Sequence, residues 1–199
     1  MTFCADLMKR VCRARSLIPR KMMTDSDIAL VARAVEGDEG AFQGLMEAHK
    51  DMVYSMAYRI LGNAEDAQDA FQETFVSAFR NLKKFRGDSK FSTWLYRIAL
   101  NRSRDILSSR RRRPQHESIH EEGFDHAAAD STDAGTDVQE ALSTLPPDYR
   151  TAITLRCIMG YTYDEAADMM GIPAGTVKTY VFRGKDELRK VLSPGAAIT

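Results

Sequence analysis

Apolar residues recur every three or four positions through most of the first half of the chain. The three longest stretches of this kind run over residues 42–60, 67–82 and 91–106. Such spacing places side chains on one side of an α-helix, so each stretch predicts a helix with one buried stripe. A shorter helix over 26–36 precedes them, and Asp38 is placed to cap the next one. His49 lies on or beside the first stripe, where we expect a satisfied interior histidine rather than a ligand.

Residues 161–191 carry the pattern of two short helices around a tight turn. Thr162 and Glu165 have the spacing of a capping box at the start of the first helix. Gly171 can adopt the positive φ that the turn requires, and the second helix is expected over about 176–191. This pattern is typical of a helix-turn-helix, whose second helix enters the major groove of DNA. The alternative is an ordinary helical hairpin with a basic, solvated face.

Between these halves, residues 114–137 lack a sustained apolar period and are rich in Asp, Glu, His, Ala, Ser and Thr. Such a composition favours a flexible linker. We therefore predict an all-α fold of two small helical domains joined by a flexible acidic linker, the C-terminal one with a helix-turn-helix. The predicted limits are 1–23 for a disordered extension, 24–113 for the first domain, 114–137 for the linker, 138–192 for the second domain and 193–199 for a tail.

Periodicity also assigns inward positions to three aromatic residues. Phe79 falls on the core side of its helix, and so do Trp94 and Phe182. Trp94 lies close to the polar segment 85–90, however, where an aromatic ring could instead stack on an unpaired base.

Charge is distributed unevenly, although the 199-residue chain has 28 Lys and Arg against 28 Asp and Glu. Residues 101–113 hold six Arg and one Asp, whereas residues 114–144 hold eight acidic residues and no Lys or Arg. This uneven distribution indicates a basic surface beside an acidic connector. Nucleic-acid binding is therefore not excluded by the net charge of zero. Three histidines of the linker have no Cys partners, which argues against a metal site. The three Cys show no metal-type spacing and fit a reducing cytoplasm.

The first 21 residues are basic and lack an apolar core long enough for a signal peptide. Met22 and Met23 offer a second position at which translation could begin. A membrane-touching amphipathic helix is the alternative for this segment. We expect a cytoplasmic protein without membrane insertion.

Three helical faces carry candidate binding residues. An acidic face on the second long helix could dock a basic partner, although compensation of the helix dipole explains it equally well. On the third, Arg97, Asn101 and Arg104 follow at helical steps. Arg side chains neutralise phosphates, and Asn can hydrogen-bond to a base edge. The second helix of the helix-turn-helix is also basic, through Lys178 and Arg183 among others.

Four segments occur in an order that identifies a family. They are DAQDAFQETF at 66–75, FRGDSKFSTWLYRIALN at 85–101, LPPDYR at 145–150 and GTVKTYVFR at 175–183. Together with the acidic linker, they resemble bacterial RNA polymerase sigma factors of the extracytoplasmic-function (ECF) type over about residues 25–192.

The resemblance implies a role for each face. Docking on the clamp coiled coil of the largest polymerase subunit is implied for Asp66, Asp69, Gln72 and Glu73. Opening and reading of the promoter −10 element is implied for Arg86, Lys90, Trp94, Arg97, Asn101 and Arg104. Reading of the −35 element, with the domain resting on the polymerase flap, is implied for Thr176, Lys178, Thr179, Phe182 and Arg183. The linker would run near the RNA exit path, and an anti-sigma factor would be a further partner.

The chain departs from the family at two positions of the helix that is implied to read the −35 element. The pair Lys178-Thr179 stands where the family usually has a basic residue and serine, and Tyr180 stands where a basic residue is common. The family also suggests that Phe182 touches DNA, against its inward position in the periodic pattern.

Binding rather than catalysis is expected, without a cofactor, because the chain has no Gly-rich phosphate loop, nucleophile elbow or paired-His motif. Two alternatives stay open. One is a stand-alone helix-turn-helix regulator that binds duplex DNA without polymerase. The other is a metal-dependent enzyme that uses the acidic face and the linker histidines.

Overall fold

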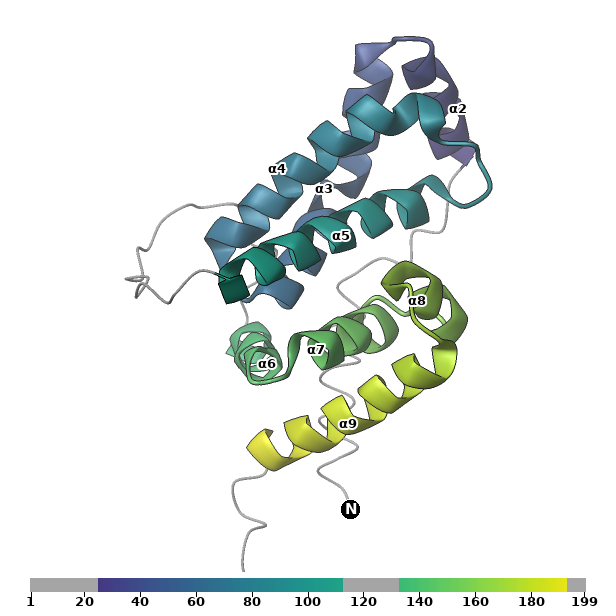
Figure 1. Cartoon of the computed structure of the whole chain (residues 1–199). Helices are drawn as coiled ribbons and strands as arrows, with labels where there is room; N and C mark the ends of the chain where they lie inside the picture. Colours follow the sequence, from purple (N-terminus) through teal and green to yellow (C-terminus); the bar gives the residue numbers. More distant parts are fainter. Residues whose placement is uncertain (1–24, 113–132, 193–199) are drawn as a thin grey trace, which may run out of the picture.

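A computed structural model describes residues 25–112 and 133–192, and all regular structure within these ranges is helical (Figure 1). The N-terminal bundle comprises α2 (Asp25–Val35), α3 (Glu39–Leu61), α4 (Ala64–Asn81), the short 3₁₀ helix η2 (Leu82–Lys84) and α5 (Phe91–Arg112). The C-terminal bundle comprises α6 (Asp133–Ser143), α7 (Pro147–Ile153), the π-helical turn η3 (Thr154–Ile158), α8 (Tyr163–Met170) and α9 (Ala174–Leu192). The predicted all-α class is thus confirmed for the described residues.

Two predicted boundaries differ from the structure. Helix α6 begins at Asp133, so the last residues of the predicted linker 114–137 are helical. Helix α9 begins at Ala174, two residues before the predicted start at Thr176. The predicted N-terminal extension 1–23 and the tail 193–199 lie outside the described residues.

Side-chain caps define where several helices begin. The Asp38 carboxylate accepts the Ala41 amide at 3.0 Å, and the Asn63 side chain accepts the Asp66 amide at 2.8 Å. At the start of α8, the predicted capping box is present: Thr162 and Glu165 each accept the backbone amide of the other, at 3.2 and 2.8 Å. Each cap satisfies amides that have no partner inside the helix. Gly171 then ends α8 with a φ of 67°, as the turn requires.

The N-terminal bundle buries a continuous apolar core between α3, α4 and α5, which includes Leu45, Met56, Phe91 and Leu95. Phe79 is not part of it, because 55% of its surface is exposed at the edge of α4, where its ring packs edge-on against Phe42. The predicted core position of Phe79 is therefore wrong.

His49 is buried and satisfied, as expected. Its Nδ1 lies 3.2 Å from the Tyr96 hydroxyl, and its Nε2 lies 3.3 Å from the Asp27 carboxylate. Burial raises the pKa of the Tyr96 hydroxyl. The three side chains come from α2, α3 and α5, so this polar cluster ties the first helix to the bundle.

The two bundles lie against one another. Figure 1 shows α7 and α8 between α5 and α9, so that the helix-turn-helix lies below the N-terminal bundle in this view. Leu155 and Ala166 of the C-terminal bundle belong to the same buried apolar cluster as Met56 and Leu100. In this arrangement, the outer side of α9 faces away from the N-terminal bundle.

Close packing of α7 on α9 depends on Gly184. A Cβ at this position would lie 2.7 Å from Ile153 Cδ1 and 3.3 Å from Tyr149 Cβ. By contrast, a Cβ at Gly175 in the first turn of the same helix meets nothing within 4 Å. Substitution by alanine is therefore expected to have opposite effects on stability at these two glycines.

We expect Gly184→Ala to lower the free energy of unfolding by about 1 kcal/mol, since overpacking outweighs the gain in helix propensity. Gly175→Ala should leave stability unchanged or raise it by a few tenths of a kcal/mol. Urea denaturation followed by circular dichroism measures both. Equal effects at the two positions would contradict the close α7–α9 packing.

Candidate nucleic-acid and partner interfaces

The outer face of α9 presents a compact group of polar and aromatic side chains. Lys178, Thr179 and Arg183 are exposed, and Phe182 is 75% exposed, the largest value among the exposed large hydrophobic residues of the described chain. Thr176 is half-buried at the start of the helix. The inward position predicted for Phe182 is wrong, because the inner side of α9 is already filled. The residues that fill it are Val177, Val181, Gly184 and Leu188.

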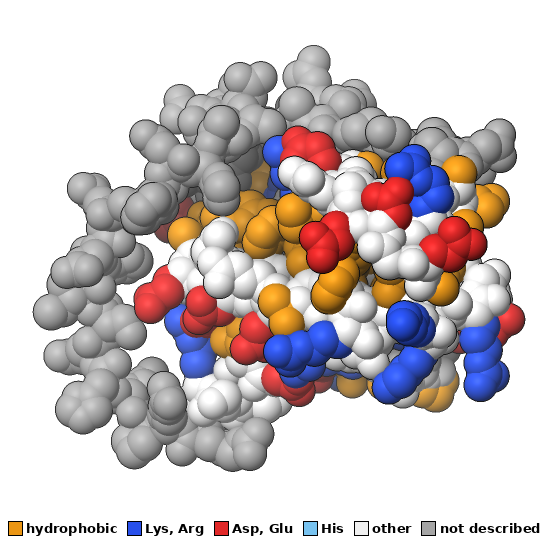
Figure 2. Space-filling model, turned by 90° about the horizontal axis from the view of Figure 1, so that it is seen from above, with side chains coloured by type: hydrophobic (Ala, Val, Ile, Leu, Met, Phe, Trp, Pro, Cys, Tyr) orange, Lys and Arg blue, Asp and Glu red, His pale blue; other side chains and the backbone are white. Residues whose placement is uncertain are grey.

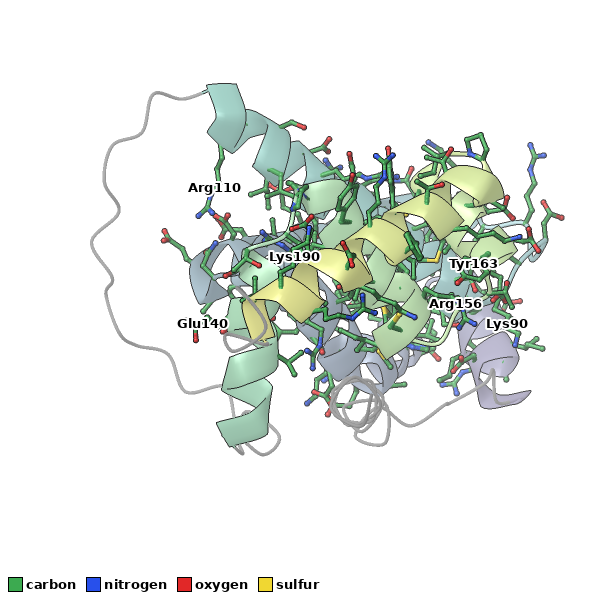
Figure 3. All side chains as sticks on the ribbon, turned by 90° about the horizontal axis from the view of Figure 1, so that it is seen from below. Lys90, Arg110, Glu140, Arg156, Tyr163 and Lys190 are labelled. Atoms are coloured by element: carbon green, nitrogen blue, oxygen red, sulfur yellow. The ribbon has the colours of Figure 1, made fainter. Side chains whose placement is uncertain are left out.

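Two residues that sequence reasoning did not single out extend this face. The Tyr163 ring lies under the Arg156 guanidinium, at 4.9 Å, and near the Lys178 ammonium, at 5.6 Å. Figure 3 shows Arg156 and Tyr163 side by side. A cation close to an aromatic ring is held in place by the ring quadrupole. The π-helical turn η3 carries Arg156, and its irregular geometry could not be predicted from periodicity.

The side chain of Arg183 interacts with a residue of α7. Tyr149 of α7 packs its ring 5.3 Å from that of Tyr180, and its hydroxyl raises the pKa of Arg183 through a side-chain hydrogen bond. Arg183 is thus a permanently charged group that α7 helps to orient. Its partner Tyr149 belongs to the LPPDYR segment, whose role in positioning Arg183 was not predicted.

Helix α5 carries the second candidate face. Arg97 and Asn101 are exposed, whereas Arg104, one turn further, is half-buried and donates from Nη1 to the Met170 carbonyl at 2.8 Å. The structure thus brings the three residues to one side of α5 but leaves only two of them open to solvent. Arg86 and Lys90, in the loop before α5, are exposed.

Trp94 is half-buried next to that loop, which fits neither a pure core position nor an open stacking platform. Its ring centroid lies 5.3 Å from that of Phe85 and 5.7 Å from that of Phe91. Phe85 is the first residue of the polar loop and Phe91 directly follows the loop, so these aromatic contacts hold its two ends together.

Helix α4 carries the predicted docking face, with Asp69, Gln72 and Glu73 exposed. Asp66 differs from the others, since its side chain is only 15% exposed and lies 2.7 Å from Arg110 Nε. Glu73 makes a longer ion pair with Arg102, at 3.8 Å. Asp66 is therefore engaged in joining α4 to α5, which sequence spacing could not indicate.

Two apolar residues accompany the acidic ones on α4. Val76 and Phe79 are 49% and 55% exposed, an unusual feature for a helix in the middle of a bundle. Figure 2, viewed from above the molecule of Figure 1, shows hydrophobic side chains gathered on this side of the protein with acidic and basic side chains around them. Exposed apolar side chains bordered by charges are typical of protein-binding surfaces.

Within residues 25–112 and 133–192, the structure contains no group of three or more His, Cys, Asp or Glu that could hold a metal ion. The same part of the chain contains no helix both long and apolar enough to cross a membrane.

Comparison with known proteins places these faces in a family. The model of Sigma-70 region 2 matches residues 45–113, and that of Sigma-70 region 4 matches residues 136–188. The RNA polymerase sigma-H factor of Pseudomonas aeruginosa is 36% identical over 184 residues, which cover 85% of this chain and 95% of that protein. The ECF RNA polymerase sigma-E factor of Escherichia coli K12 is 35% identical over 183 residues, covering 85% and 95%.

A solved structure of CnrH in complex with the cytosolic domain of CnrY resembles most of the chain. The TM-score is 0.63 at 28% sequence identity, and the match covers 86% of this chain and 100% of CnrH. The complex of the sigma factor RpoE with the anti-sigma factor NepR from Bartonella quintana has the same fold, with a TM-score of 0.63 at 24% identity over 77% of this chain and 98% of RpoE.

The two matched regions define a transcription initiation factor that binds promoter DNA and core RNA polymerase. The chain belongs to the extracytoplasmic-function (ECF) family of RNA polymerase sigma factors. Its relatives are transcription initiation factors rather than enzymes.

Proposed function

We propose that α9 reads the −35 element as duplex DNA, with Lys178, Thr179, Phe182 and Arg183 toward the major groove. The exposure of Phe182, at 75%, is the observation that carries this proposal, because a large apolar side chain left in solvent between cations suits contact with base methyl groups. Thr176 and the cluster of Arg156 and Tyr163 flank the same face and contact the DNA backbone.

The −10 element is read by α5 and the loop before it. Arg97 and Asn101 supply a phosphate contact and a base contact, and Arg86, Lys90 and Arg104 add positive charge along the strand. Trp94, with Phe85 and Phe91 behind it, forms one wall of the site for an unstacked base.

Core polymerase docks on α4 through Asp69, Gln72 and Glu73, with Val76 and Phe79 as the apolar part of the surface. Asp66 supports this surface from below through Arg110 rather than by direct contact. We assign the partner surface to the clamp coiled coil of the largest subunit, and the C-terminal bundle to the flap. The two functional domains are residues 24–113 and, since α6 begins at Asp133, residues 133–192.

An anti-sigma factor is a further proposed partner. CnrH and Bartonella RpoE were solved with CnrY and with the anti-sigma factor NepR, respectively. The exposed apolar and acidic side chains of α4 offer such a partner a surface that would exclude polymerase.

The two DNA-reading faces are separable by mutation. Arg183→Ala is expected to weaken binding of a −35 duplex roughly tenfold and to relax preference at one base pair, as for a lost base contact. Asn101→Ala should leave that binding unchanged and impair promoter opening. Transcription with core polymerase on a promoter library gives the recognised sequence, gel shifts measure duplex binding, and permanganate footprinting measures opening.

Arg189→Ala is the matched control for Arg183→Ala. Arg189 lies near the other end of α9, where it pairs with Asp186 at 3.0 Å, so its loss should alter neither preference nor opening. If Asn101→Ala weakens −35 duplex binding and leaves opening intact, the assignment of the two faces to the two elements is reversed.

A further inference from the structure

Helix α7 contacts the DNA-reading helix α9 through a tyrosine near its start. Figure 1 shows α7 alongside α9, and Tyr149, in the first turn of α7, is half-buried. A Cβ at Gly184 would lie 3.3 Å from Tyr149 Cβ, and the Tyr149 ring centroid lies 5.3 Å from that of Tyr180. Tyr149 is therefore confined between the backbone of α9 and the side chain of Tyr180.

Arg183 lies over the same part of α9. It directly precedes Gly184 and follows Tyr180 by three positions, a spacing that places side chains next to one another on a helix. Its exposed guanidinium donates to the Tyr149 hydroxyl, and this hydrogen bond is the main reason why the pKa of Arg183 is raised. The bond uses one of the five N–H groups, so the other donors stay available to a ligand.

Such a restraint matters for an exposed arginine. A long side chain in solvent samples many rotamers, and a ligand that fixes one of them must overcome that freedom. A guanidinium that is already oriented loses less freedom on binding, but only to an acceptor that its planar fork faces. The O6 and N7 atoms of guanine form such an acceptor pair in the major groove, whereas a phosphate is the same at every base pair.

Lys178, another exposed cation that we assign to this face, is held differently. Its ammonium lies 5.6 Å from the centroid of the Tyr163 ring, so it contacts a ring face and not a single acceptor atom. A lysine ammonium is moreover a point charge on a flexible stem, without the planar fork of an arginine. Of the two cations, Arg183 is thus the better suited to read a base, and Lys178 to neutralise a phosphate.

Position 180 supports this division of roles. The chain has Tyr180 where a basic residue is common in the family, so α9 has one cation fewer. The half-buried Tyr180 ring instead packs against Tyr149, which bonds to Arg183. The face therefore has less charge but a more restrained arginine, a combination that favours selectivity over general affinity for DNA.

We propose that Tyr149 is a specificity-determining positioning residue, which holds the Arg183 guanidinium, with Tyr180 behind it, toward a guanine of the −35 duplex. Tyr149 acts through Arg183 and does not touch DNA itself. The proposal rests on the proposed role of α9, and it adds which base that helix selects and which residue outside the helix fixes the choice.

Tyr149→Phe tests the proposal, because it removes the hydroxyl and keeps the ring that packs on Tyr180 and Gly184. The matched control is Tyr58→Phe on α3. Tyr58 is also a half-buried tyrosine that stacks on another, Tyr54, with the ring centroids 6.3 Å apart, but it lies in the N-terminal bundle. The full-length chains are incubated with a library of −35 duplexes, and sequencing of the bound fraction gives the base preference at each position. Titrations at several salt concentrations give the salt slope.

We expect Tyr149→Phe to lower the preference for guanine at one position about threefold, as for the loss of a single hydrogen bond, with the other positions and the salt slope unchanged. Arg183→Ala should remove the preference at the same position, and Tyr58→Phe should alter none. Tyr180→Leu keeps the Tyr149 hydroxyl but removes the ring behind it, so it should also relax this position. Far-UV circular dichroism checks that each variant folds.

A second measurement contains no DNA. NMR relaxation of the Arg183 Nε–H group reports how freely the guanidinium moves on the ps–ns timescale. The signal is assigned by its loss in Arg183→Ala. Its order parameter should be higher in the wild-type chain and in Tyr58→Phe than in Tyr149→Phe.

The proposal is overturned if Tyr149→Phe leaves unchanged a position that Arg183→Ala flattens, or if it weakens binding to all duplexes alike, as a general loss of support for the bundle would. A preference at that position for a base other than guanine, or equal mobility of Arg183 with and without the hydroxyl, contradicts it as well. If Tyr149→Phe does not fold, the same criteria apply to Tyr180→Leu. If Arg183→Ala alters no position, both the assignment of α9 to the −35 element and this proposal are wrong, whereas failure of the proposal alone leaves the effect of Arg183→Ala intact.

Discussion

Replacing Arg150 by methionine is expected to lower the free energy of unfolding by about 3 kcal/mol, because buried carbonyls then lose a charged donor. The guanidinium donates to Ile60 at 3.0 Å, to Ser143 at 2.7 Å and to Leu145 at 3.1 Å. Burial lowers the pKa of Arg150, but a guanidinium keeps its charge at neutral pH. One side chain thus binds carbonyls in the last turns of α3 and α6 and the carbonyl of Leu145, two residues beyond the end of α6.

The geometry of the guanidinium matters as well as its charge. Arg150→Lys retains a cation but offers a single centre in place of a planar fork, so it should recover only part of the loss. Arg189→Met is the control, since this exposed Arg pairs with Asp186 at the surface, and its change should stay within about 0.5 kcal/mol. Urea denaturation followed by circular dichroism compares the variants. Equal stabilities for Arg150→Met and Arg189→Met would show that the carbonyl bonds contribute nothing.

Reversal of two charges on α4 is expected to have the largest effect on polymerase binding. In Asp69→Lys/Glu73→Lys, like charges would meet a basic partner surface, and we expect affinity for core polymerase to fall on the order of 100-fold. Both residues are exposed, so helix content and thermal stability should stay near the wild-type values. Fluorescence anisotropy of the labelled chain, titrated with core enzyme, gives the affinity.

The matched control is Glu47→Lys/Asp51→Lys on α3. These two residues are also exposed and four positions apart, and their reversal changes net charge by the same amount. It should weaken polymerase binding less than threefold. An equal loss in both variants would indicate that polymerase responds to net charge and not to the α4 face.

Local features of the fold could be predicted because their causes are local. The cap at Asp38, the capping box at Thr162 and the left-handed turn at Gly171 each depend on residues within one turn of one another, so they follow from spacing alone. The three proposed binding faces were indicated by the family resemblance of the ordered segments.

Two aromatic placements were wrong for a common reason. Periodicity gives the angular position of a residue around its helix. Whether a side chain at that position is buried depends on how far the neighbouring helices extend over it. Phe79 lies at the edge of α4, where its ring packs against Phe42 but stays 55% exposed, and Phe182 lies on the outer side of α9.

Long-range polar contacts could not be predicted, since their acceptors are backbone atoms or distant side chains. Arg150 binds the carbonyl of Ile60, a group that every residue possesses, across 90 positions of the chain. The family resemblance implied a docking role for Asp66, but its side chain lies against Arg110 from the far end of α5. The contact between the two bundles combines such bonds with a shared buried apolar cluster, and neither can be located from spacing along the chain.

The position of Trp94 gives the protein a built-in optical reporter. It is the single Trp of the chain, and its indole lies against Phe85 and Phe91 at the base of the 85–90 loop. Its emission therefore comes from the proposed −10 site alone, without an attached dye. A base that enters beside the ring would quench that emission, whereas binding of a duplex to α9 would leave it unchanged. Strand capture and duplex binding can thus be timed separately in one stopped-flow record of the unmodified chain.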